Sequence, residues 1–186
     1  MRAAVDRTAQ REDASLVSAA QAGDTRAFEA LVREYTPAVY GHALRFFGDP
    51  GAAEDVMQEV FVKTYRSLGS FDGRSTFSTW LFRVTRNACL DMFRAGRKQA
   101  APLDPLDLPD LGGSEFADGV AMTTDLERAL QTVPPEERDA FNAVALFGLT
   151  YAQASGVLGA PVGTVKSRVF RARKALIVIL GLGGGA

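Results

Sequence analysis

The chain has 186 residues, of which 47% are hydrophobic and 23% charged, and its formal net charge is −1. This composition excludes a disordered chain, and the single cysteine, Cys89, excludes an intramolecular disulfide and a thiolate zinc cluster. Because His42 is the single histidine, a Ser-His-Asp triad and a histidine metal site are disfavoured, and we expect no catalytic site, no metal and no cofactor.

Helical periodicity dominates the chain and no convincing strand pattern occurs, which predicts an all-α fold. Residues 1–12 lack the apolar core of a signal peptide and are predicted to form a disordered tail. A first domain is predicted over residues 13–97, with helices at 13–22, 25–47, 50–68 and 76–97. Asp49 followed by Pro50 predicts a helix start, whereas Pro37 predicts a kink or break near Thr36.

A flexible acidic linker is predicted over residues 98–122, which contain three prolines, three glycines, four Asp and one Glu. The linker separates two basic parts of the chain. Residues 61–100 carry a net charge of +6, residues 101–140 carry −8, and residues 141–186 carry +5. The overall charge of −1 conceals the two basic parts, which indicate local surfaces for an anionic partner.

A second small helical domain is predicted over residues 123–182, with helices at 124–133 and from Pro134 onward. Thr150 and Gln153 form a T-x-x-Q capping box for a short helix that ends at Gly159. The apolar stretch ALIVILGL near the C-terminus spans about eight residues, whereas a membrane span needs about 20. We therefore expect no membrane insertion and a cytoplasmic protein.

The stretch PVGTVKSRVFRARKAL forms the second helix of a predicted helix-turn-helix and carries five basic side chains and no acidic one. Helical spacing turns Val165, Val169, Ala172 and Leu176 inward. The side chains predicted to face a DNA major groove are Thr164, Lys166, Ser167, Arg168, Phe170, Arg171, Arg173 and Lys174. The alternative is an ordinary solvated helix face, which the preceding helix, the turn glycine and the capping box make less favourable.

Two stretches of the chain resemble bacterial sigma factors of the sigma-70 family, extracytoplasmic-function (ECF) type. GLTYAQASGVLGAPVGTVKSRVFRARKAL resembles their C-terminal promoter-binding region, called region 4. AEDVMQEVFVKTYRSLGSFDGRSTFSTWLFRVTRNACLDMFR resembles region 2, and together these stretches with the preceding helices cover most of residues 13–180 except the linker. Ala154 and Ser155 depart from the family pattern, in which a larger aliphatic residue and an alanine are expected.

The resemblance implies an alternative sigma factor that binds core RNA polymerase, recognises the −10 and −35 promoter elements and promotes strand opening. It implies that Asp55, Gln58 and Glu59 dock on the clamp helices of the largest polymerase subunit. It implies −35 contacts from the basic helix, with Ser167, Phe170 and Arg171 on bases. The residues implied for the −10 element are Asp72, Gly73, Arg74, Ser75, Thr76, Phe77, Arg83, Arg86 and Asn87. Trp80 and Phe82 are assigned to the core.

Polymerase, promoter DNA and an anti-sigma factor are the partners that the family implies. On a promoter, the linker would span about 50 Å between the two elements, which lie more than one helical turn apart. Off polymerase, it would let the domains fold together. Two alternatives stay open at this point: a sigma mimic that sequesters anti-sigma factors, and a stand-alone helix-turn-helix transcription regulator.

Overall fold

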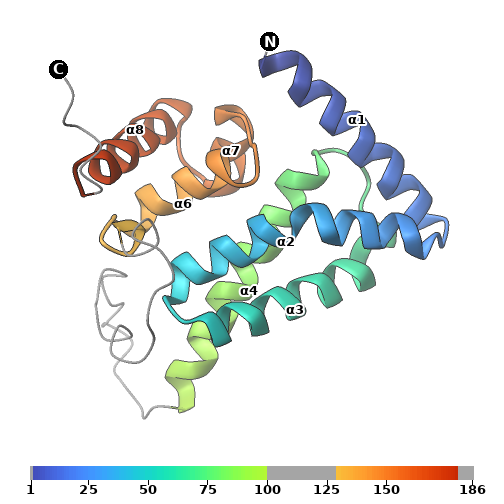
Figure 1. The fold of residues 1–186 in the computed structure, drawn as a ribbon, viewed down its shortest axis with the longest axis horizontal. Coiled ribbons are helices and arrows are strands. Elements are labelled where there is room, and N and C mark those ends of the chain that lie inside the picture. The colour runs from blue at the N-terminus through green and yellow to red at the C-terminus, as the bar shows by residue number, and fades with distance from the viewer. Residues whose placement is uncertain (1, 100–128, 180–186) are drawn as a thin grey trace.

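The computed structural model describes residues 2–99 and 129–179, and within these ranges the chain is helical and has no strand (Figure 1). The elements are α1 (Arg2–Gln21), α2 (Thr25–Phe47), α3 (Pro50–Ser67), the short 3-10 helix η1 (Leu68–Ser70), α4 (Phe77–Gln99), α6 (Pro135–Ala145), α7 (Tyr151–Leu158) and α8 (Val162–Ile179). The all-α prediction is confirmed. Most of the predicted linker, and the first half of the helix predicted at 124–133, lie outside the described residues.

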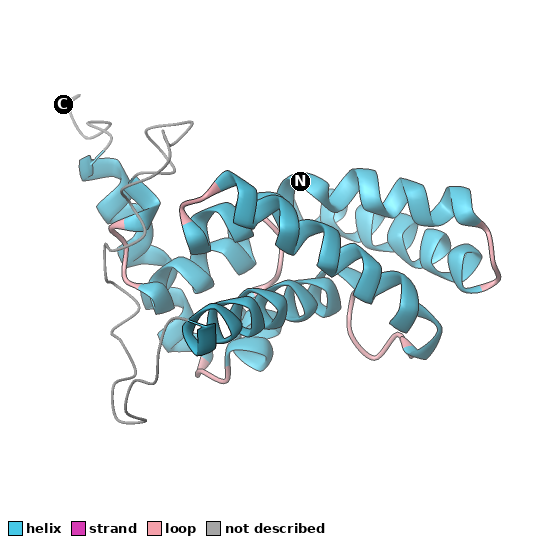
Figure 2. Ribbon diagram, turned by 90° about the horizontal axis from the view of Figure 1, so that it is seen from below, coloured by secondary structure: helices cyan, strands magenta, loops and turns pink. Residues whose placement is uncertain are grey.

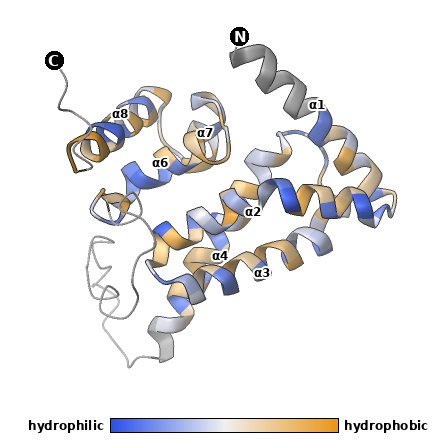
Figure 3. Cartoon of the chain, in the orientation of Figure 1, coloured by the Kyte–Doolittle hydropathy of each residue, from blue (hydrophilic) through white to orange (hydrophobic). Residues whose placement is uncertain are grey.

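The N-terminal domain consists of α1 to α4, with α2, α3 and α4 side by side and α1 across one end (Figures 1 and 2). Asp49 caps α3 as predicted, since its carboxylate accepts hydrogen bonds from Gly51 N and Ala52 N. Val56 and Val60 on α3 are fully buried, as is Phe82 on α4. Each helix carries both hydrophilic and hydrophobic residues (Figure 3), and the buried apolar sides form the core.

Two predicted boundaries in this domain differ from the structure. α1 begins at Arg2 and not at Asp13, because residues 2–12 contain neither Gly nor Pro and are rich in good helix formers. α2 continues through Pro37, so the break expected near Thr36 does not occur. Pro37 removes one backbone hydrogen bond, and the burial of the next two residues, Ala38 and Val39, holds the helix against the core.

The C-terminal domain contains the predicted helix-turn-helix in α7 and α8. The capping box is present, with Gln153 N donating to Thr150 Oγ1 at 3.2 Å and Thr150 N donating to Gln153 Oε1 at 2.8 Å. Gly159 ends α7 with a φ of 63°, a conformation that favours glycine. Ser155, one of the two departures from the family pattern, donates from Oγ to Ala160 O at 2.6 Å and so closes the turn.

The inner face of α8 is also as predicted, because Val165, Val169, Ala172 and Leu176 are all buried. The exposed apolar residues at the end of α8 do not make it a membrane helix. Among the described residues, no helix combines the length and the hydropathy needed to cross a bilayer.

The two domains pack against each other and share one hydrophobic core. Phe147 of the C-terminal domain lies edge-on to Phe82 of α4, with ring centroids 5.2 Å apart. Polar contacts add to this boundary, since Gln131 Nε2 and Arg138 Nη1 donate to Arg45 O at 2.6 and 2.9 Å. We call this arrangement the closed form.

Candidate nucleic-acid interface

The outer face of α8 carries the side chains predicted to read DNA. Six of the eight are exposed, Thr164 and Arg168 are half-buried, and Phe170 is 67% exposed. A large aromatic ring on the surface costs free energy in water, because its apolar area is not buried. A ring in this position is therefore suited to apolar contact with a base, such as the methyl group of thymine.

Two arginines of this face are paired within the C-terminal domain. Arg168 forms an ion pair with Glu136, and Arg171 forms one with Glu137, so both acidic partners come from the first turn of α6. These carboxylates hold the guanidinium groups in place in the absence of DNA. Binding to phosphate or to a guanine edge would exchange one anionic or acceptor partner for another.

The 71–76 loop between η1 and α4 forms the centre of the predicted −10 site. Gly73 has a φ of 71°, and Arg74 N donates to Asp72 Oδ1 at 3.1 Å, which fixes a tight turn. Thr76 Oγ1 lies 2.7 Å from Thr79 Oγ1, the hydroxyl of a residue in the first turn of α4. The loop therefore has a defined shape and brings the Thr76 hydroxyl group and the Arg74 guanidinium group together.

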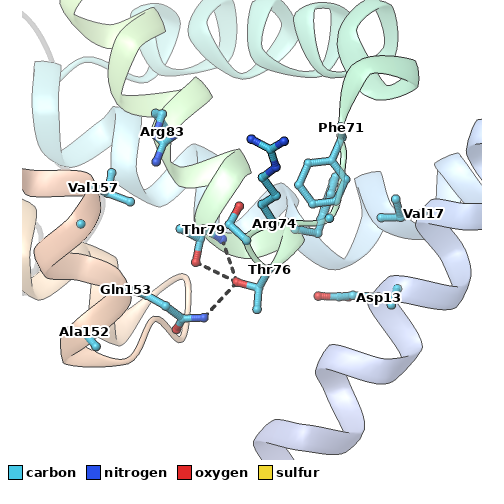
Figure 4. Close-up of a pocket in the computed structure, with 15 residues that line it drawn as sticks. Asp13, Val17, Phe71, Arg74, Thr76, Thr79, Arg83, Ala152, Gln153 and Val157 are labelled. Carbon is cyan, nitrogen blue, oxygen red and sulfur yellow. Dashed lines mark hydrogen bonds between the residues drawn. The ribbon is translucent and has the colours of Figure 1, made fainter.

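A cavity of about 620 Å³ lies between this loop, α1 and α7 (Figure 4). Phe71, Gly73, Arg74, Ser75, Thr76, Phe77, Thr79 and Arg83 line it from the N-terminal domain. Of the residues predicted to form the pocket for an unstacked base, all but Asp72 line this cavity. Phe77 is only 4% exposed and contributes to the cavity from the core, where it packs against Tyr35 and Trp80.

The remaining predicted −10 residues lie along α4. Asn87 is exposed, whereas Arg86 is half-buried and its Nε donates to Asp139 Oδ2 of α6 at 2.9 Å. Beside the loop, Gln153 Nε2 of α7 lies 3.2 Å from Thr76 Oγ1. In the closed form, two predicted DNA contacts of one domain are therefore occupied by side chains of the other.

Several residues of this interface were not predicted from the sequence. Asp139 pairs with Arg86, which lies 53 residues earlier in the sequence. Asp13 of α1 lines the cavity, although it was expected only as the start of a helix. The acidic residues in the first part of α6, Glu136, Glu137 and Asp139, were the available sequence signal for such a pair.

The residues predicted to dock on polymerase lie together on α3. Asp55 and Gln58 are exposed and Glu59 is half-buried, with its carboxylate 2.7 Å from Lys63 Nζ. Val56 and Val60 face the core on the opposite side. This face of α3 is open in the closed form and is acidic at its centre.

Comparison with known proteins identifies the family. Residues 31–99 match the family model of sigma-70 region 2, and residues 123–176 match that of sigma-70 region 4. The chain belongs to the sigma-70 family. It is an alternative sigma factor that acts with RNA polymerase in transcription initiation, as the resemblance implied.

Among the relatives of this sigma factor, the RNA polymerase sigma-H factor of Pseudomonas aeruginosa is 36% identical, with 90% of this chain and 93% of the relative aligned. The ECF RNA polymerase sigma-E factor of Escherichia coli K12 is 34% identical, with the same two coverages.

Two solved structures resemble the present one. CnrH in complex with the cytosolic domain of CnrY gives a TM-score of 0.66 at 27% identity, covering 93% of this chain and 99% of CnrH. The sigma factor RpoE of Bartonella quintana, in complex with the anti-sigma factor NepR, gives 0.64 at 25% identity, covering 84% and 98%. Neither alternative interpretation, a sigma mimic or a stand-alone regulator, is better supported than the sigma factor.

Proposed function

We propose that this sigma factor reads the −35 element with α8 and captures the −10 strand with the 71–76 loop and α4. The observation that carries the proposal is the exposed basic face of α8, with Phe170 at its centre and the four buried residues behind it. Arg171 is assigned to a guanine edge, and Arg168 and Arg173 to phosphates. Thr76 and Arg74 would line the slot for an unstacked base, with Arg83 and Asn87 on the adjacent duplex.

The proposed docking site for the clamp helices of core polymerase is the face of α3 with Asp55, Gln58 and Glu59. Carboxylates four residues apart suit basic partners. The protein would work in the cytoplasm without a catalytic step of its own, because it supplies recognition and polymerase supplies the chemistry. Since two similar solved structures contain an anti-sigma factor or a bound cytosolic domain, an anti-sigma factor is proposed as a further partner.

Transcription of fragmented genomic DNA tests the proposed function. Core polymerase is used with and without the protein, and the 5′ ends of the transcripts are sequenced. New start sites with two shared upstream motifs at fixed spacing are expected. If the protein binds polymerase stably but produces no new starts, it is a mimic or needs an activator.

Arg171→Ala is expected to weaken discrimination at one −35 base pair by about 5- to 150-fold, because a guanine contact is lost. Binding to core polymerase should not change, since α8 lies apart from α3. The measurement is the binding of the holoenzyme to promoter fragments carrying each base pair at that position. Arg173→Ala is the matched control, because loss of a phosphate contact should weaken all fragments alike and reduce the salt dependence. Equal loss of polymerase binding and promoter selection in Arg171→Ala would contradict the assignment.

The double variant Asp55→Ala, Glu59→Ala should bind core polymerase about tenfold more weakly, because it loses two ion pairs between exposed groups, each worth about 0.2–1 kcal/mol. Titration of fluorescently labelled protein with core polymerase measures this affinity. Glu54→Ala on the same helix is the control, since Glu54 is an exposed carboxylate outside the predicted set. A similar loss in the control would indicate a general effect of negative charge.

A further inference from the structure

One wall of the cavity beside the 71–76 loop consists of residues to which no promoter contact has been assigned. Asp13, Ala14 and Val17 of α1 line it, and Asp13 provides the only carboxylate among the described lining residues. Asp13 lies outside residues 31–99, which match region 2. In Figure 4 its side chain points across the cavity toward Thr76.

α1 and the loop form one unit of the N-terminal domain. Gln21 Nε2 donates to Leu68 O at 2.9 Å and to Phe71 O at 2.8 Å, which ties the end of α1 to the start of the loop. Val17 is buried in the same core as Phe77. The wall with Asp13 therefore stays in place when α7, on the opposite side of the cavity, moves away.

The carboxylate of Asp13 is held in one orientation. Tyr35 donates its hydroxyl to Asp13 Oδ2, and the Tyr35 ring lies edge-on to Phe77 with centroids 5.3 Å apart. A carboxylate has about four acceptor sites, so one bond from Tyr35 leaves capacity for a ligand. Partial burial raises the pKa of Asp13 and also strengthens its hydrogen bonds, because water competes less.

We propose that Asp13 is a specificity-determining residue for the flipped −10 base and selects a base with an exocyclic amino group against thymine. The inference rests on the proposed −10 function of the loop. A carboxylate accepts hydrogen bonds from an exocyclic amino group. The exocyclic groups on the Watson–Crick edge of thymine are both carbonyl oxygens, which repel a carboxylate and flank the single N3–H donor. Phe71, which also lines the cavity, supplies an aromatic face for stacking.

The test uses holoenzyme assembled from core polymerase and the full chain, with the promoter found in the transcription experiment. Forked fragments carry each of the four bases in turn at every non-template −10 position. We expect the native holoenzyme to disfavour thymine about tenfold or more at one position, and Asp13→Asn to remove most of this preference. Glu12→Gln is the matched control, because Glu12 is an exposed neighbour on the same helix, and it should keep the preference.

Two further variants separate the outcomes. Tyr35→Phe keeps the ring but loses the hydroxyl that orients Asp13, and it should reduce the thymine discrimination in part. Thr76→Val tests the loop itself. If Asp13→Asn keeps the native base profile while Thr76→Val alters it, the role of Asp13 is wrong and the −10 assignment stands. If neither variant alters the profile at any position, the −10 assignment of the loop is wrong as well.

Discussion

A disulfide between cysteines placed at positions 41 and 146 is expected to abolish promoter-dependent transcription, and a reductant is expected to restore it. Gly41 lies on α2 and Leu146 at the end of α6, so the bond would hold the closed form. In that form Gln153 contacts Thr76 and Asp139 pairs with Arg86. Promoter elements lie more than one helical turn, about 35 Å, apart, so α7 cannot stay on the loop while α8 reads the upstream element.

The side chains at these two positions would be neighbours. A Cβ on Gly41 would lie 3.7 Å from Leu146 Cδ1, which is van der Waals contact. A disulfide needs the two Cβ atoms roughly 3.5 to 4.5 Å apart, so its formation would draw the end of α6 and α2 together. The new side chain also approaches Arg45 Nη1 at 3.0 Å, the end of a long side chain that can shift. Cys89 does not compete, because it is buried and burial raises the pKa of its thiol.

Run-off transcription before and after oxidation measures the effect, and the single variants Gly41→Cys and Leu146→Cys receive the same oxidant. They should retain activity throughout, which excludes oxidative damage as the cause. Neither position belongs to the proposed DNA or polymerase contacts. If the oxidised double variant transcribes as well as its reduced form, the domains do not need to separate, and the closed form is compatible with initiation.

Local patterns explain why much of this fold was predictable. The inner residues of α8 recur at helical spacing, and burial of Val165 and Val169 follows directly from that spacing. The capping box at Thr150 and the cap at Asp49 each involve groups within three residues of one another. Such features depend on neighbouring residues alone, so one sequence is enough to identify them.

The contacts between the domains could not be predicted in the same way. Gln153 has one amide atom in the capping box, and its other amide atom reaches Thr76, which is 77 positions away. Arg86 was interpreted as a DNA contact, and nothing in its local sequence indicates Asp139 as a partner. The local sequence around a charged side chain is the same whether the side chain contacts solvent, DNA or another helix. Only the packing of α6 against α2 and α4 distinguishes them.

Acid is expected to destabilise the protein between about pH 6.5 and pH 4 through His42. The ring is fully buried at the domain boundary, with Nδ1 lying 3.3 Å from Asn142 Nδ2. Burial lowers the pKa of His42 from 6.5 to about 4, and nearby arginines act in the same direction while Asp139 opposes them. The unfolded chain therefore binds a proton in this range that the folded chain does not, and the free energy of unfolding should fall by about 3 kcal/mol as the pH decreases.

Urea unfolding at several pH values measures this slope, and His42→Gln is the matched variant because it keeps a polar side chain that does not titrate. His42 is the only histidine of the 186-residue chain, so no other imidazole contributes. Asp13, with its pKa raised by burial, would contribute in the opposite direction and can only reduce the slope. A native slope that persists in His42→Gln would assign the acid sensitivity elsewhere. A slope that flattens in the variant would assign the acid sensitivity to His42, at the contact between α2 and α6. The closed form would then require an uncharged His42 ring.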